Sequence, residues 1–308
     1  MPDLARDYRD VGKRVSNWGR WGPEDERGTL NLITPERIAA AAQLVRRGAV
    51  FELGIPLDST GPQALAGRMN PVRLMSESGA DQDYPGGIKW ADDYVFMPLQ
   101  AGSQWDAFGH VWYDGQLYNG FAESEISPHG AKRCSITAFT KGIVGRGVLV
   151  DLARMMGVDW IQGGYVITPA DLDAAILAQG VELLPGDILL VRTGWRKKFV
   201  DEGDAATWMA EEPGLGMEAM QWVRDKDLGA LCMDNWGIEV IPNEDPVITN
   251  PVHCVLLRDI GIPLGEILDF EELADDCASD GVYEFLFCGP PLKFTGAVGS
   301  PVNPVVIK

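Results

Sequence analysis

The sequence predicts a mixed α/β fold built as one domain across residues 1–308. Segments with the spacing of helices and of buried strands alternate along the chain, and several helix ends carry typical capping residues. No stretch between the two ends is rich enough in Pro, Gly and Ser, or in charge, to form a linker. A chain of 308 residues buries roughly 75% of the surface that its unfolded form exposes, so its core needs neither disulfides nor metal.

Two predicted helices share one capping signature. Each begins with a threonine that can cap the first turn and a proline at the first helical position. Each ends at a glycine, which adopts the left-handed conformation that terminates helices. These helices are predicted at residues 34–48 and 168–180, and apolar strands follow them at 51–57 and 188–192.

The same alternation continues towards the C-terminus. A helix at 216–226 precedes a strand at 230–234. Another helix at 252–259, stopped by Gly261, precedes a strand at 262–268.

Residues 60–93 break this pattern. They have little periodicity and many Gly, Pro and polar residues, and a loop of this length inside a compact domain is usually a lid or a binding loop. Disorder is the alternative that the sequence leaves open.

The composition excludes several classes of partner. The chain has 26 basic and 45 acidic residues. Its net charge of −19 repels nucleic acid and anionic membranes. No secretory signal is recognisable, and no apolar stretch approaches the roughly 18 residues of a membrane span. No phosphate-binding glycine motif occurs, and the five cysteines form no CxxC pair. We expect a cytoplasmic protein whose partners are a small molecule and further copies of the chain.

The scarcity of histidine limits where imidazole chemistry can take place. The chain has three histidines. His129 lies between a proline and a glycine, a setting typical of a solvated turn. His253 opens an apolar helix, where a histidine is more often a cap than a ligand. His110 differs because it ends a cluster of polar residues.

That cluster follows an apolar, strand-like run at 94–99. Loops at the ends of strands commonly carry function. Within eleven residues the cluster offers four potential metal ligands or proton carriers: Gln100, Gln104, Asp106 and His110. Such side chains also bond their own backbone in ordinary loops, so the cluster alone leaves both interpretations open. The functional one gains support from residues 250–266, where a histidine and a glutamate supply a second, distant set of ligands.

These two segments resemble the cyclase or kynurenine formamidase-like family of metal-dependent hydrolases. The hallmark of that family is HxGTHxDxxxH, followed much later by a paired His and Glu. The positions that match the hallmark are Gln100, Gln104, Asp106 and His110, and the downstream pair is His253 and Glu266. The segments at 17–31 and 295–302 resemble the longer branch of the family.

Two glutamines replace the first two histidines of the hallmark. The resulting QxxxQxD pattern resembles the branch that includes zinc-dependent trans-dienelactone hydrolases. A glutamine offers a neutral carbonyl oxygen where histidine offers a neutral nitrogen, so the ligand charge is unchanged and the donor is harder and weaker. The site should therefore hold Zn²⁺ less tightly than a histidine-rich site and tolerate Mn²⁺ better.

The resemblance implies a role for each of these residues. The implied ligands of one or two divalent ions, Zn²⁺ or Mn²⁺, are Asp106, His253, Glu266 and one or both of Gln100 and Gln104. His110 is implied as the general acid and base. The implied reaction opens a lactone, a cyclic amide or an aryl formamide with water activated by the metal.

Aromatic residues near the motif are candidates for the wall of a pocket that binds a ring substrate. Core packing is the alternative for each of them. The candidates are Trp105, Phe108, Trp112 and Tyr113, and on resemblance alone Trp18 and Trp21.

The family resemblance also implies a swivelling β/β/α fold and assembly as a homodimer or homotetramer. Two other functions remain open at this point. One is a metal-assisted cyclase or dehydratase, which would use the same residues. The other is a metal-free relative that only binds a ligand.

Overall fold

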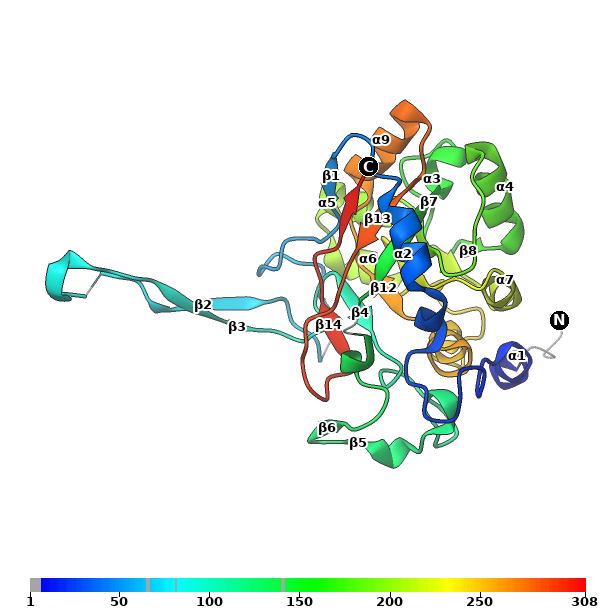
Figure 1. Cartoon of the computed structure of the whole chain (residues 1–308), viewed down its shortest axis with the longest axis horizontal. Coiled ribbons are helices and arrows are strands. Elements are labelled where there is room, and N and C mark those ends of the chain that lie inside the picture. Colours follow the sequence, from blue (N-terminus) through cyan, green and yellow to red (C-terminus); the bar gives the residue numbers. More distant parts are fainter. Residues whose placement is uncertain (1–6, 65–66, 81, 140–141) are drawn as a thin grey trace.

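Four parallel strands form the centre of a large mixed sheet (Figure 1). The computed structural model describes residues 7–64, 67–80, 82–139 and 142–308. In the described part, antiparallel strands flank the parallel centre of β7, β9, β11 and β12 on both sides. The nine strands are, in spatial order, β1 (Val50–Glu52), β15 (Val305–Ile307), β13 (Glu284–Cys288), β7 (Val144–Asp151), β9 (Ile188–Arg192), β11 (Ala230–Met233), β12 (Leu264–Glu266), β4 (Gln104–Asp106) and β14 (Gly299–Pro301). The predicted mixed α/β class is confirmed.

Helices pack on this sheet and against one another. The helices are α1 (Tyr8–Val15), α2 (Pro35–Ala42), α3 (Leu152–Met155), α4 (Pro169–Gln179), α5 (Trp195–Glu202), α6 (Ala205–Ala210), α7 (Ala219–Asp225), α8 (Pro251–His253), the π-helix η6 (Cys254–Ile260) and α9 (Glu271–Asp280). Short 3₁₀ helices are η1 (Gly28–Leu32), η2 (Pro85–Gly87), η3 (Tyr118–Gly120), η4 (Glu123–Glu125) and η5 (Ile136–Phe139). Helix α2 packs on β7 and β13, whereas α1, α7 and η6 contact one another. Two of the three small strand pairs in the described part of the chain are β8 (Val166–Ile167) with β10 (Gly214–Leu215), and β5 (Ile126–Ser127) with β6 (Gly130–Ala131).

Helix α4 shows how local sequence sets a boundary. Thr168 Oγ1 accepts a hydrogen bond from the backbone N–H of Asp171 at 3.3 Å, and the Asp171 carboxylate accepts one from the N–H of Thr168 at 2.8 Å. This reciprocal capping box and the proline after it fix the start of the helix. Gly180, at φ 65°, ends it. The predicted helix and the predicted strand at 188–192 are both confirmed.

The other helix with this signature is shorter than predicted. It ends at Ala42 rather than at Gly48. The backbone N–H groups of Arg47, Gly48 and Ala49 instead donate to the carbonyl of Lys308, which joins this turn to the C-terminal strand. A tertiary contact therefore replaces the last helical turn.

A small second apolar cluster lies beside the end of β12. Trp195 and Trp208 are fully buried, and each indole N–H donates to the backbone carbonyl of the other residue, at 3.0 and 2.6 Å. Ile267, the residue after Glu266, packs in the same cluster. The cluster thereby anchors the chain next to a candidate ligand.

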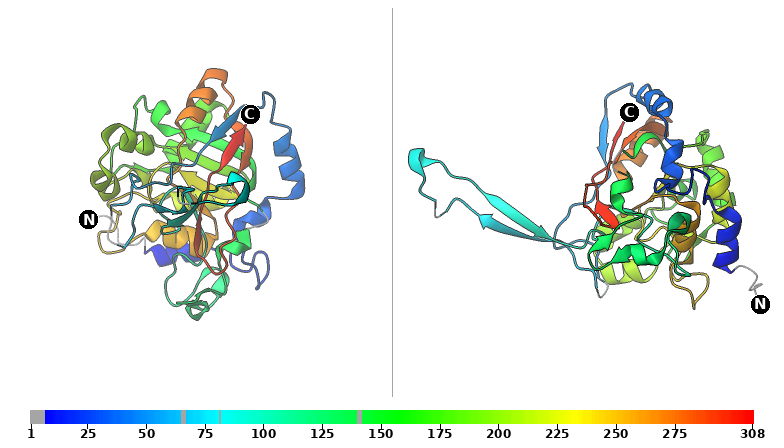
Figure 2. Two further views of the ribbon diagram at one scale, coloured as in Figure 1. Left: turned by 90° about the vertical axis from the view of Figure 1, so that its left-hand side faces the viewer. Right: turned by 60° about the horizontal axis from the view of Figure 1, so that its bottom comes forward.

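Residues 72–80 and 82–96 form an arm rather than an irregular loop (Figures 1 and 2). The antiparallel strands β2 (Val72–Glu77) and β3 (Asp92–Phe96) carry it away from the body of the molecule. Tyr84 and Trp90 stack near its tip, with ring centroids 4.1 Å apart. The run at 94–99, expected to lead into the candidate site, thus contributes to the arm, and the site begins on the separate strand β4. A role for 60–93 as a lid or binding loop stays a prediction.

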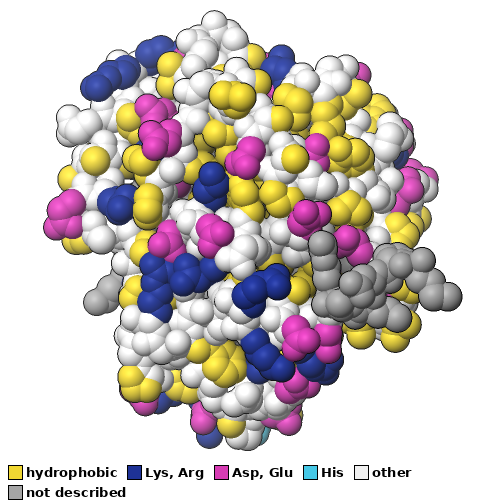
Figure 3. Space-filling model, turned by 90° about the vertical axis from the view of Figure 1, so that its right-hand side faces the viewer, with side chains coloured by type: hydrophobic (Ala, Val, Ile, Leu, Met, Phe, Trp, Pro, Cys, Tyr) yellow, Lys and Arg dark blue, Asp and Glu magenta, His cyan; other side chains and the backbone are white. Residues whose placement is uncertain are grey.

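The face opposite the arm carries mixed charge (Figure 3). Lys and Arg side chains lie among Asp and Glu side chains there. Arg20 and Asp227 form an ion pair at 2.6 Å. Within the ranges described above, no helix is long and apolar enough to cross a membrane.

Candidate metal centre

The pairing of β4 with β12 brings two parts of the predicted site together. Gln104 lies opposite Glu266 in the antiparallel register. Side chains alternate between the two faces of a strand, so Gln104 and Asp106 share one face, and directly paired residues lie on the same face. The Gln104 Nε2 atom donates to Glu266 Oε2 at 2.7 Å and lies 3.4 Å from Asp106 Oδ1.

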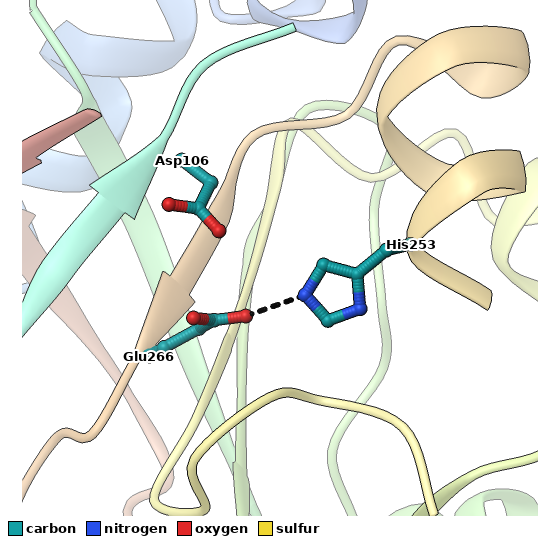
Figure 4. A group of neighbouring side chains, drawn as sticks. All are labelled: Asp106, His253 and Glu266. Carbon is teal, nitrogen blue, oxygen red and sulfur yellow. Dashed lines mark hydrogen bonds and ion pairs between the residues drawn. The ribbon is translucent and has the colours of Figure 1, made fainter. Parts of the chain in front are cut away.

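His253 reaches this face from the end of α8 (Figure 4). Its Nε2 atom lies 2.9 Å from Glu266 Oε1, and its Nδ1 atom lies 2.5 Å from Glu239 Oε1. The backbone N–H groups of Val252 and His253 also donate to the Glu239 carboxylate, at 3.2 and 3.1 Å. Glu239 therefore holds both the helix end and the orientation of the imidazole ring.

The three candidate ligands converge on one point. One ligand atom from each of Asp106, His253 and Glu266 lies within 4.8 Å of the other two. All three residues are buried, with 0%, 4% and 2% of their surface exposed. Gln104 Oε1 and Asp106 Oδ2 are buried without a hydrogen-bond partner, which is rare for polar atoms in a folded protein. Two carboxylates, an imidazole and an amide oxygen form a donor set that suits a divalent metal ion.

Burial controls the protonation of these groups. It raises the pKa of Asp106 to about 6, and it raises the pKa of nearby Glu212 well above its usual range. Burial alone would lower the pKa of His253, but hydrogen bonds to Glu239 and Glu266 outweigh it and raise that pKa. Crowded carboxyl groups are thus held together at an electrostatic cost that a bound cation would relieve.

His110 lies on the more open side of the cluster. It follows β4 in a turn, where its backbone N–H donates to the Ala107 carbonyl at 2.9 Å. Its Nε2 atom is 3.6 Å from Asp106 Oδ2, and its side chain is 19% exposed against 1% for that of Asp106. Burial lowers the pKa of His110, and Asp106 only partly opposes this effect. A neutral imidazole at this place is suited to accept a proton.

Gln100 lies in the turn before β4, against strand β14. A methyl group on Gly299 would come within 2.4 Å of Gln100 Nε2, so a larger residue there would displace the amide. Gly299 pairs with Asp106, and cross-strand partners share a face, so Gln100 lies on the side of the sheet that carries the candidate ligands. Within the described chain, no hydrogen bond joins its side chain to the other candidates.

The structure corrects the predicted substrate role of Trp105 and Phe108. Trp105 lies between Gln104 and Asp106 in β4, so it points to the opposite face, where its Nε1 donates to the Gly289 carbonyl at 2.6 Å. Phe108 is fully buried against Tyr118 and Phe139. Both rings pack in the core.

Trp18 and Trp21 lie in the segment after α1. Trp18 Nε1 donates to the Arg258 carbonyl at 2.6 Å, and the Arg20 guanidinium lies 4.8 Å from the Trp21 ring centroid. A substrate role for these two residues stays a prediction.

Sequence reasoning missed two buried glutamates at this site. Glu239 holds His253, and Glu212 accepts hydrogen bonds from the backbone N–H groups of Trp236 and Gly237, at 2.6 and 3.0 Å. Neither glutamate lies in a segment with ligand-like spacing, so only their burial reveals them.

Comparison with known proteins assigns the chain to a family. The Cyclase family model matches residues 29–240, which is more than half of the sequence. The chain belongs to the cyclase family. A solved structure described as a novel cyclase is 42% identical to this family member, covers 96% of it and 99% of its own chain, and superposes with a TM-score of 0.90.

More distant solved structures share the cyclase fold. Isatin hydrolase A from Labrenzia aggregata, bound to benzyl benzoate, is 18% identical, with 86% of this chain and 94% of its own covered and a TM-score of 0.63. A predicted metal-dependent hydrolase from Bacillus stearothermophilus is 17% identical, with 85% and 98% covered and a TM-score of 0.56. No match is found among curated proteins.

Proposed function

We propose that this cyclase-family protein is a metal-dependent hydrolase that opens a lactone, a cyclic amide or an aryl formamide. The observation that carries the proposal is the buried convergence of Asp106, His253 and Glu266 within 4.8 Å, next to His110. Isatin hydrolases and predicted metal-dependent hydrolases among the similar structures support the same reaction class.

The proposed cofactor is a divalent ion, Zn²⁺ or Mn²⁺. Asp106, His253 and Glu266 would hold it, with the free Oε1 of Gln104 and the amide of Gln100 as further ligands. A divalent ion supplies Lewis-acid chemistry and lowers the pKa of a bound water toward about 7.

Three residues of the chain supply the remaining roles of orienting the histidine and transferring the proton. Glu239 accepts a hydrogen bond from the Nδ1–H group of His253. The His253 Nε2 atom therefore stays turned towards the candidate metal centre. His110 accepts a proton from the attacking water at Nε2 and returns it to the leaving oxygen or nitrogen. The Asp106 carboxylate lies 3.6 Å from the same Nε2 atom, so its negative charge favours the protonated imidazole that forms.

Metal analysis and hydrolysis assays test this proposal together. Protein purified without chelator should contain a divalent ion, and lactone, cyclic amide and formanilide probes should yield a carboxylic acid. Asp106→Ala should lose both the ion and the activity, whereas Asp201→Ala, which alters a carboxylate on the surface of α5, should keep them. Full metal with no acid released would favour a cyclase or dehydratase. Absence of metal, with no activity on adding Zn²⁺ or Mn²⁺, would favour a ligand-binding relative.

The arm supports a proposal about assembly. Its strands and tip expose large apolar side chains by 42% to 70%: Leu74, Met75, Ile88, Trp90, Tyr94, Val95 and Phe96. An isolated two-stranded hairpin is only marginally stable, and apolar patches of this kind mark interfaces. A specific interface buries at least about 1,000 Å² in total, and reciprocal packing of two arms would contribute to that area. A second copy is therefore the proposed occupant, in a homodimer or homotetramer. The cytoplasmic location stays a prediction.

A further inference from the structure

Arg68 lies over the ring of Trp236, whose chain neighbour Gly237 is close to the His253 ring. Its guanidinium carbon is 5.5 Å from the ring centroid of Trp236. Burial dominates the pKa shifts of Asp106 and His110, and the Arg68 charge acts in addition and lowers both pKa values. The cation therefore lies beside Trp236 and within electrostatic reach of Asp106 and His110.

Arg68 has no acidic partner among the residues that the structure describes. Many other arginines of this acidic chain do have one, including Arg20, Arg133 and Arg192. An unpaired guanidinium beside a reactive site is free to bind an anion that arrives from solvent.

Trp236 is fixed next to a candidate ligand. Its backbone N–H donates to Glu212 at 2.6 Å, and the following residue, Gly237, lies close to the His253 ring. The Trp236 indole Nε1 atom is buried but has no hydrogen-bond partner. A donor and an aromatic face are thus available beside the Arg68 cation.

Arg68 and Trp236 are more exposed than the candidate ligands. The side chains of Asp106, His253 and Glu266 are buried, whereas Arg68 and Trp236 are half-buried. A group bound by Arg68 would therefore be a substituent of the substrate rather than the bond that reacts beside the candidate ligands.

We propose that Arg68 and Trp236 bind a carboxylate substituent on a planar ring substrate. This inference rests on the proposed hydrolase function and names its substrate class as anionic. The guanidinium pairs with the carboxylate, and the indole contacts the ring and offers its N–H. Because the chain carries a net charge of −19, an anionic substrate needs a local cation to overcome the general repulsion.

Matched substrates test this subsite. N-formylanthranilate and formanilide differ by one carboxylate, and a carboxylated and a plain butenolide form a second pair. Arg68→Gln should raise KM for the carboxylated members by about 10- to 100-fold, as loss of a charged hydrogen-bonding partner predicts, and raise KM for the neutral members far less. Arg68→Lys should restore part of the loss. The control Arg73→Gln, an exposed arginine on the arm, should behave as the wild type.

A binding measurement separates this inference from the proposed function. Calorimetric titration with benzoate and with benzamide needs no turnover. Benzoate should bind the metal-loaded wild type and the Arg73→Gln variant more tightly than it binds Arg68→Gln, and benzamide should not distinguish them. Equal benzoate affinity in Arg68→Gln and wild type would overturn the inference while leaving hydrolysis intact. If the protein turns over no probe but the wild type still binds benzoate more tightly than Arg68→Gln does, the proposed reaction alone is overturned.

Discussion

The variant Glu239→Gln should weaken metal binding although Glu239 is not a proposed ligand. Glu239 is 1% exposed and accepts from four donors. Its Oε1 atom faces the His253 ring N–H at 2.5 Å and the His253 backbone N–H at 3.1 Å. Its Oε2 atom faces the Val252 backbone N–H at 3.2 Å and the Asn243 Nδ2 atom at 3.1 Å.

A glutamine cannot satisfy this set of donors. In one orientation its NH₂ group faces Val252 and Asn243, and in the other it faces the His253 ring and forces the wrong tautomer. Removing a partner that orients a ligating histidine typically costs 10- to 100-fold in metal affinity, or about 1.4–2.8 kcal/mol. The buried donors left without an acceptor should also cost about 1–3 kcal/mol of folding stability.

Competition with a chelating dye measures the affinity, and thermal unfolding of the metal-free protein measures the stability. Glu272→Gln, on the exposed face of α9, serves as the control and should match the wild type in both. Wild-type metal affinity in a folded Glu239→Gln variant would refute the assigned role of Glu239 and the orientation of His253.

Four further predictions follow from the same geometry. His110→Ala should slow turnover by about 10²- to 10⁴-fold and keep its metal content, and loss of the ion would make His110 a ligand instead. Gly299→Ala should weaken metal binding as much as Gln100→Ala, because the methyl group displaces the amide, and wild-type affinity in both variants would remove Gln100 from the ligand set. Burial raises the pKa of Asp234 from 3.8 to about 7, so its contribution to the free energy of unfolding should fall as pH rises from about 4 to 7. Chemical denaturation of Asp234→Asn should therefore show a flatter dependence of that free energy on pH than the wild type shows. The same slope in both proteins would contradict this. Replacing both Tyr94 and Phe96 by Ser should shift light-scattering mass to the monomer, whereas Leu177→Ser, at 82% exposure on α4, should not; a monomeric wild type would exclude the proposed assembly.

The sequence determined the features that depend on neighbouring residues. The helix from Thr168 to Gly180 and the strand at 188–192 were predicted because a capping box, a helix-ending glycine and an apolar run act over a few residues. The motif and the downstream pair also named the carboxylates and histidine that the structure brings together.

Tertiary structure decided which residues face the centre. Trp105 was predicted to contact substrate because it lies inside the motif, but the pairing of β4 directs it to the opposite face. Glu239 contacts His253 and Arg68 contacts Trp236, although both lie in segments whose spacing carries no ligand pattern. Residues 60–93 carry little periodicity, yet part of this region pairs into an arm with apolar surfaces. Strand pairing and burial depend on residues far apart in the chain, so no local pattern encodes which side chains they bring to one point.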